Sequence, residues 1–147
     1  MIGFVDTNII AYARDRREPH KQRIAETWLV GLARSREGRL SWQVLIEYYA
    51  VATHPKKLGL TAESARADIR ALQARKPVGP DPKLLESAWI QQERHGFSWW
   101  DAMIVAAALS TGSEILLSED LQHGLVVDNT LNLINPFAPN APAPPAP

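Results

Sequence analysis

The opening stretch constrains the fold most, because the apolar run at residues 2–5 ends abruptly in Asp6, Thr7 and Asn8. A short, continuous apolar run is typical of a strand buried on both faces, as in a parallel sheet. Asp6 then lies at the carboxyl end of that strand, where open α/β sheets bind their ligands. Thr7 and Asn8 favour a helix start. The stretch alone leaves two roles open for Asp6, a ligand-binding acid or a capping residue.

A second stretch of the same kind follows late in the chain, where the apolar run at residues 115–117 ends in Ser118, Glu119 and Asp120. Between and after these runs, the apolar periodicity and end signals predict helices and strands in alternation. This alternation favours an α/β fold with a largely parallel sheet. The expected helices are 9–13, 20–36, 43–53, 62–75, 82–95 and 99–111, with Ser41, Thr61, Asp81 and Ser98 as N-caps. The expected strands are 2–5, 39–41, 115–117, 125–127 and 131–134, with a further short one near Val78.

Composition excludes several classes of protein. The 147 residues contain no cysteine, which removes disulfides, thiolate zinc sites and a cysteine nucleophile. No run approaches the roughly 18 apolar residues of a membrane span, and Asp6 interrupts the start of any signal peptide. We therefore expect a cytoplasmic protein without a membrane partner. Sixteen basic and 16 acidic residues give zero net charge. This balance argues against a protein that coats nucleic acid non-specifically, which would be basic, but it allows a local basic patch.

Two further acids stand in informative positions. Glu47 lies on or beside the apolar face of helix 43–53, where an ionised carboxylate is costly unless it is paired or coordinated. It could instead lie at the edge of that face and reach water. Asp101 is the third residue after Ser98, so it suits the start of helix 99–111, and it could serve only to close a capping box.

The four acids suggest a specific chemistry if they meet at one edge of the sheet. Carboxylates in one pocket repel each other and cannot all be ionised without cations. Mg²⁺ and Mn²⁺ prefer oxygen ligands and would relieve this repulsion. Such metal ions can activate water and stabilise the leaving oxygen of a phosphodiester. The predicted reaction is therefore phosphodiester hydrolysis.

The ordered motifs resemble a known family. They are Asp6-Thr7-Asn8 after a strand, Glu47 within residues 43–48, Asp101 within residues 100–107, and Ser118-Glu119-Asp120 after a strand. Together they resemble the PIN domain and, more narrowly, the VapC-type toxin ribonucleases of type II toxin–antitoxin systems. The resemblance covers residues 1–137 and implies a three-layer α/β/α nuclease domain with a mostly parallel central sheet. Residues 138–147 are rich in proline and alanine and are expected to form a disordered tail.

The resemblance also implies roles for individual residues. Asp6, Glu47, Asp101 and Asp120 would be the catalytic metal ligands for Mg²⁺ or Mn²⁺. Glu119 is the alternative to Asp120 as the fourth acid, and Asp128 is a more distant one. Polar side chains beside the acids would orient them, namely Thr7, Asn8 and Ser118.

The family further implies an endoribonuclease that acts on RNA, forms a homodimer and is inhibited by a cognate antitoxin. Trp42, Trp99 and Trp100 could stack bases, or could lie in the core or a dimer interface. The candidate phosphate contacts are basic residues in several groups: Arg14, Arg16, Arg17, His20, Lys21, Arg23, Lys56, Lys57, Arg66 and Arg70. Two alternatives stay open, a non-catalytic interaction module with the same fold and a phosphoryl-transfer α/β domain.

Overall fold

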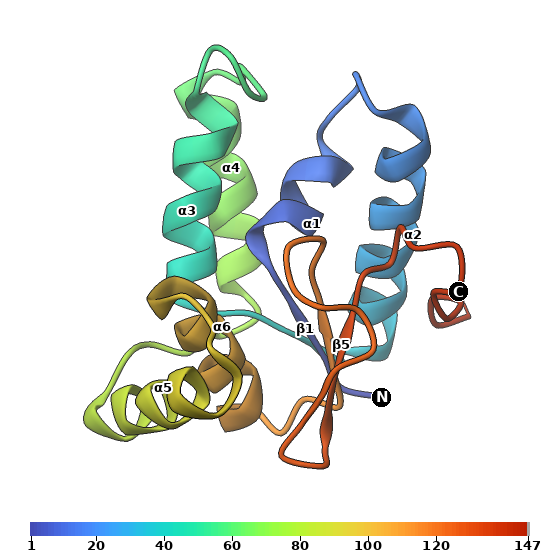
Figure 1. Cartoon of the computed structure of the whole chain (residues 1–147). Helices are drawn as coiled ribbons and strands as arrows, with labels where there is room; N and C mark the ends of the chain where they lie inside the picture. Colours follow the sequence, from blue (N-terminus) through green and yellow to red (C-terminus); the bar gives the residue numbers. More distant parts are fainter. Residues whose placement is uncertain (147) are drawn as a thin grey trace.

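The central sheet is the element that positions everything else. The computed structural model describes residues 1–146, and Figure 1 shows its sheet between two groups of helices. The strand order is β2-β1-β3-β5-β4, and every neighbouring pair is parallel except β4 and β5. The mostly parallel sheet predicted from the sequence is confirmed. The strands are β1 (Gly3–Val5), β2 (Gly38–Arg39), β3 (Ile115–Leu117), β4 (Val126–Val127) and β5 (Leu131–Ile134).

Six helices surround the sheet in the part of the chain that the structure describes. Their N-caps at Ser41, Thr61, Asp81 and Ser98 are confirmed, because each side-chain oxygen accepts a backbone N–H of the first turn. Val78 forms only an isolated bridge to Ser41 rather than a strand. The helices are α1 (Thr7–Ala13), α2 (Pro19–Ser35), α3 (Trp42–Thr53), α4 (Ala62–Gln73), α5 (Pro82–His95) and α6 (Trp99–Ser110).

The helices form layers on both sides of the sheet. In Figure 1, α2 lies on one side of β1, and α5 and α6 lie on the other. Leu32 of α2 packs so closely over Gly3 that a Cβ there would lie 3.0 Å from its side chain. The alanine-rich run 106–108 of α6 is buried, as expected for a helix packed closely within an α/β fold.

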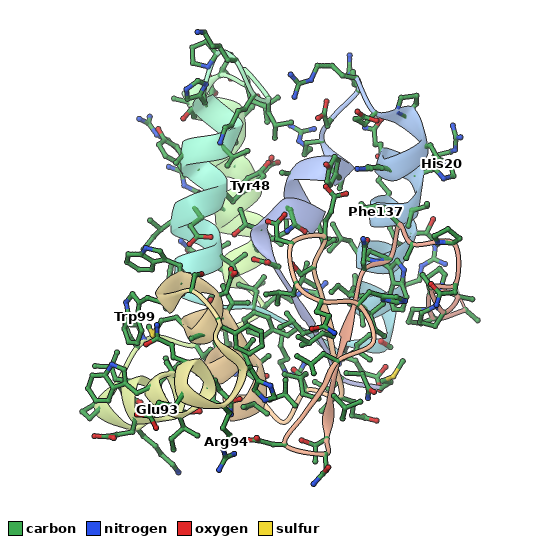
Figure 2. The ribbon with its side chains drawn as sticks, in the orientation of Figure 1. His20, Tyr48, Glu93, Arg94, Trp99 and Phe137 are labelled. Carbon is green, nitrogen blue, oxygen red and sulfur yellow. The ribbon has the colours of Figure 1, made fainter. Side chains whose placement is uncertain are left out.

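Helices α1, α3 and α4 are joined by a polar contact at the edge of the core. Tyr48 of α3, labelled in Figure 2, has a fully buried ring. Its hydroxyl donates a hydrogen bond of 2.5 Å to Asp68 of α4. The Arg14 guanidinium lies 3.1 Å from the same carboxylate. Burial and the Asp68 charge raise the pKa of Tyr48, so the phenol stays protonated and can donate.

The segment after β5 runs back towards α1 and α2 (Figure 1). The Phe137 ring lies edge-on to Tyr12 of α1, with the ring centroids 5.0 Å apart. A Cβ at Gly31 of α2 would lie 3.1 Å from the Pro145 carbonyl oxygen. Residues 138–146 contain no helix or strand, residue 147 lies outside the described range, and disorder of this tail stays a prediction. Within residues 1–146, no helix is both long enough and apolar enough to cross a membrane.

Candidate functional site

One pocket of about 550 Å³ opens at the carboxyl ends of β1 and β3. Val5 and Leu117 are paired in parallel register, so the two strands end together and bring Asp6 beside Ser118. The four acids predicted from the sequence all line this pocket, which therefore collects carboxylates from four separate parts of the chain: Asp6, Glu47, Asp101 and Asp120.

Asp6 caps a helix and faces the pocket at the same time. One carboxylate oxygen accepts the Thr7 backbone N–H at 2.7 Å, and the other accepts the Ser118 hydroxyl at 2.8 Å. Burial raises the pKa of Asp6 to about 6, and the charges of Glu47 and Asp120 add to this, while the two hydrogen bonds oppose it. The two roles left open by the sequence are thus combined in one residue.

Glu47 is held in place by two donors. The Thr7 hydroxyl donates to one carboxylate oxygen at 3.0 Å, and the Gln43 amide donates to the other at 2.9 Å. The same Gln43 nitrogen lies 3.2 Å from the carbonyl oxygen of Trp100, so it joins α3 to the start of α6. The sequence prediction did not include Gln43. Its position one helical turn before Glu47 is the signal that could have identified it.

Asp101 lies in the first turn of α6 and is half-buried. Its backbone N–H donates to the Ser98 hydroxyl at 3.2 Å, so Ser98 is the cap and the Asp101 side chain still lines the pocket. Burial raises the pKa of Asp101, the Ser98 hydroxyl opposes this, and the charges of Asp120 and Glu47 raise it further. The mutual repulsion expected from the sequence therefore acts between these side chains.

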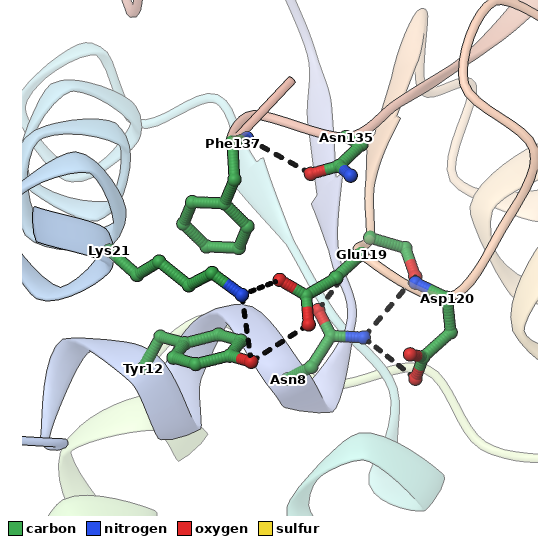
Figure 3. Close-up of polar contacts among 8 residues, drawn as sticks. Asn8, Tyr12, Lys21, Glu119, Asp120, Asn135 and Phe137 are labelled. Carbon is green, nitrogen blue, oxygen red and sulfur yellow. Dashed lines mark hydrogen bonds and ion pairs between the residues drawn. The ribbon is translucent and has the colours of Figure 1, made fainter. Parts of the chain in front are cut away.

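Asn8 connects the two strand-end acids, and Figure 3 shows its contact with Asp120. Its amide nitrogen lies 3.1 Å from an Asp120 carboxylate oxygen, 3.3 Å from the Ser118 hydroxyl and 3.5 Å from Asp6. Its amide oxygen accepts the Glu119 backbone N–H at 3.1 Å. Asn8 therefore fixes the loop that carries Asp120 against the start of α1.

Glu119 has partners of its own on the far side of this loop (Figure 3). The Lys21 ammonium lies 2.6 Å from one carboxylate oxygen, and the Tyr12 hydroxyl donates to the other at 2.8 Å. The Lys21 nitrogen also lies 4.7 Å from the centroid of the Tyr12 ring. Both Glu119 oxygens are thus engaged, and Tyr12 and Lys21 are site neighbours that the sequence did not identify as such.

The third candidate for the fourth acid lies elsewhere. Asp128 accepts hydrogen bonds from Gln91 at 3.2 Å and from Arg94 at 3.1 Å, and it does not line the pocket.

The chemistry of the pocket suits a hard divalent cation. Its acidic side chains offer only oxygen ligands, and their charges repel one another, which a cation would relieve. Within residues 1–146, no three carboxylate or imidazole side chains are close enough to enclose a metal ion by themselves. Mg²⁺ commonly retains several waters and takes only one or two carboxylates directly, so an open arrangement of acids fits it.

The chain resembles several solved structures, among them three toxin or toxin–antitoxin structures. One is VapC20 from Mycobacterium tuberculosis, described as a sarcin-ricin-loop-cleaving toxin (TM-score 0.53, 21% identity, 78% of this chain and 86% of that one). Another is VapBC2 from Rickettsia felis bound to a promoter DNA fragment (TM-score 0.58, 19% identity, 92% and 100%). The third is VapBC-1 from nontypeable Haemophilus influenzae (TM-score 0.52, 24% identity, 82% and 87%). At these identities the likeness establishes the fold.

The sequence has no significant match among curated proteins. The family model for the PIN domain, however, matches residues 3–126, which run from the start of β1 to the first residue of β4 and include all four acids. The chain therefore belongs to the PIN domain family.

Proposed function

We propose that this protein is a metal-dependent endoribonuclease that hydrolyses phosphodiester bonds in RNA as the toxin of a toxin–antitoxin pair. The observation that carries the proposal is the single pocket lined by the four acids Asp6, Glu47, Asp101 and Asp120. Membership of the PIN domain family and the likeness to VapC20 and two VapBC structures support it.

The four acids would hold Mg²⁺ or Mn²⁺. When bound, the cation supplies positive charge that attracts the phosphodiester and stabilises the charge that develops on its oxygens. The chain's own polar residues keep the carboxylates in place. Thr7 and Gln43 hold Glu47, while Asn8 and Ser118 hold Asp120 and Asp6. Such supporting contacts typically change metal affinity by about 10- to 100-fold when they are removed.

Asp120 is the better candidate for the fourth acid than Glu119. Its carboxylate is exposed at the pocket and receives one hydrogen bond from Asn8. Both oxygens of Glu119 are engaged by Lys21 and Tyr12. The Lys21 ammonium already offsets the charge of Glu119, whereas Asp120 forms no ion pair within residues 1–146.

Protein partners are part of the proposal. Two of the similar structures are VapBC assemblies, which supports a cognate antitoxin for this chain. A homodimer is supported by three exposed apolar side chains beside the pocket, Trp42 (40% exposed), Ile46 (69%) and Trp100 (63%). These three side chains line one groove, and an exposed apolar patch of this kind marks an interaction surface. The non-catalytic alternative is disfavoured because all four acids are present.

Cleavage of total cellular RNA by the purified, partner-free protein tests the proposal. We expect discrete fragments with Mg²⁺ or Mn²⁺, none with chelator, and none from the Asp101→Asn variant. Asp81→Asn is the matched control, because Asp81 also starts a helix but lies outside the pocket, and asparagine is an equally good cap. The proposal would be contradicted if the folded wild-type protein cleaves no RNA with Mg²⁺ and none with Mn²⁺.

A further inference from the structure

Two basic side chains line the acidic pocket, Arg17 and Lys57. They come from two loops, residues 14–18 between α1 and α2 and residues 54–61 between α3 and α4. Both loops lie at the same end of the molecule, at the top of Figure 1. The pocket thus carries positive charge on two separate walls beside its carboxylates.

Arg17 is held in a fixed orientation. Its guanidinium makes two hydrogen bonds to Asp15, at 2.9 and 3.0 Å, and the Arg17 backbone N–H donates to the same carboxylate at 3.1 Å. Asp15 is 8% exposed, so the carboxylate is a rigid support for the cation. The Arg17 side chain is itself 61% exposed, and its Nη1 group makes no hydrogen bond within residues 1–146. A guanidinium fixed on one edge keeps donors available for a phosphate on the other.

Lys57 is presented by a hydrogen-bonded loop. Its backbone N–H and that of Gly59 both donate to the His54 carbonyl at 3.0 Å, and the Leu60 N–H donates to Ala52 at 2.8 Å. The Lys57 side chain is exposed and forms no ion pair in the described part of the chain. Its charge is therefore available to a ligand.

The other basic residues near these loops are placed differently. Lys21, which is paired with Glu119, and Arg14, which is paired with Asp68, do not line the pocket. Arg16 and Lys56 are exposed but do not line the pocket. From the many basic residues in the sequence, the geometry therefore selects Arg17 and Lys57.

We propose that Arg17 and Lys57 bind phosphate groups that neighbour the scissile phosphate in the same RNA strand. These contacts would position the strand across the acids. This inference rests on the proposed function. A polyanion entering an acidic pocket needs compensating positive charge at its walls, and phosphate contacts fix the register of a strand without reading its sequence.

The sequence supplies an adjacent control for each residue. Arg17→Met is compared with Arg16→Met, and Lys57→Met with Lys56→Met, in an Asp101→Asn background with Mg²⁺. Binding of a short fluorescent single-stranded RNA is measured by anisotropy over a range of salt concentrations. We expect the Kd to rise about fivefold in the Arg17 and Lys57 variants, and the slope of log K against log salt to become shallower by roughly 0.7 for each. The Arg16 and Lys56 variants should match the background protein.

The outcomes separate this inference from the proposed function. Equal salt slopes in the two members of each pair, or no RNA binding at all, would overturn the inference even if the wild-type protein cleaves RNA. Shallower slopes in the Arg17 and Lys57 variants than in their controls would support it whether or not cleavage is seen, because binding is measured apart from catalysis. Arg17→Met leaves Asp15 without its partner, so its melting temperature is measured alongside. Lys57→Met disturbs no ion pair of the described chain and decides the result if the Arg17 variant unfolds.

Discussion

The side-chain amide nitrogen of Asn8 lies 3.1 Å from the Asp120 carboxylate, although the two residues are 112 positions apart in the chain. The contact exists because β1 and β3 are parallel neighbours that end at the same level of the sheet. Each strand is followed by a short polar sequence at that edge. The two sequences are joined by hydrogen bonds of Asn8 and Ser118. Strand order and register therefore place Asp6 and Asp120 together, while helices α3 and α6 add Glu47 and Asp101 to the pocket.

Adjacent acids should differ in their importance for catalysis. We expect Asp120→Asn to lower the rate of metal-dependent RNA cleavage by roughly 100-fold or more, because a side chain that faces the cation loses its charge. Glu119→Gln should lower the rate less than tenfold, since Glu119 is bound to Lys21 and Tyr12. Cleavage rates at saturating Mg²⁺ measure both. The reverse order would identify Glu119 as the fourth acid.

The Thr7 hydroxyl should set metal affinity through Glu47. Thr7→Val keeps the shape of the buried side chain but removes the donor 3.0 Å from the Glu47 carboxylate. We expect the Mg²⁺ concentration for half-maximal cleavage to rise about tenfold, as is typical when a supporting contact is lost. Thr27→Val is the control, because Thr27 is exposed on α2 and its hydroxyl bonds only to its own helix. An unchanged metal requirement in Thr7→Val would show that this contact does not orient Glu47.

The metal-free protein should become more stable when Asp6 loses its charge. The pKa of Asp6 is raised from 3.8 to about 6 on folding, so the folded state binds the proton more tightly than the unfolded state does. The stability contribution of Asp6 therefore falls as pH rises from about 4 to about 6, and then stays constant. The asparagine of Asp6→Asn cannot titrate. The free energy of unfolding of this variant should therefore exceed that of the wild type by about 1–3 kcal/mol at pH 7.5.

Urea unfolding of both proteins in chelator, at pH 4 and pH 7.5, measures this difference. The gain in the free energy of unfolding from Asp6→Asn should be small at pH 4 and should reach its full size at pH 7.5. An advantage that is equal at both values would mean that the ionisation of Asp6 is not its cause.

Tyr48 should contribute to stability through its hydroxyl. Tyr48→Phe leaves the Asp68 carboxylate with Arg14 alone, so we expect a loss of about 1–2 kcal/mol in the free energy of unfolding. Tyr49→Phe is the matched control, because the neighbouring Tyr49 hydroxyl makes no side-chain hydrogen bond within residues 1–146. Chemical denaturation compares the two. Equal losses would indicate that the hydrogen bond from Tyr48 to Asp68 adds nothing to the free energy of unfolding.

Local signals in the sequence predicted much of this structure. The caps at Ser41, Thr61, Asp81 and Ser98 were predictable because a capping side chain bonds within its own first turn. The sequence signals place the start of α1 at residue 9, two residues later than the structure does. Asp6 rather than a later residue is the cap, so the helix begins at Thr7.

Side-chain contacts between different helices and loops could not be predicted from the sequence. Gln43 reaches the Trp100 carbonyl only because α3 and α6 start beside each other. Glu119 turns to Tyr12 and Lys21 because the loop after β3 passes α1 and α2. Such contacts depend on helix packing across the sheet, which periodicity along one segment does not encode.

Direct measurement of Mn²⁺ binding tests the central claim, that the four acids form one divalent-cation site. Calorimetric titration would compare the wild-type protein with Asp6→Asn, Glu47→Gln, Asp101→Asn, Asp120→Asn and the control Glu119→Gln. We predict that the wild type and Glu119→Gln bind Mn²⁺ alike, and that each of the other four variants binds it at least tenfold more weakly. Wild-type protein that binds no Mn²⁺, or binding that all four variants retain unchanged, would contradict the account.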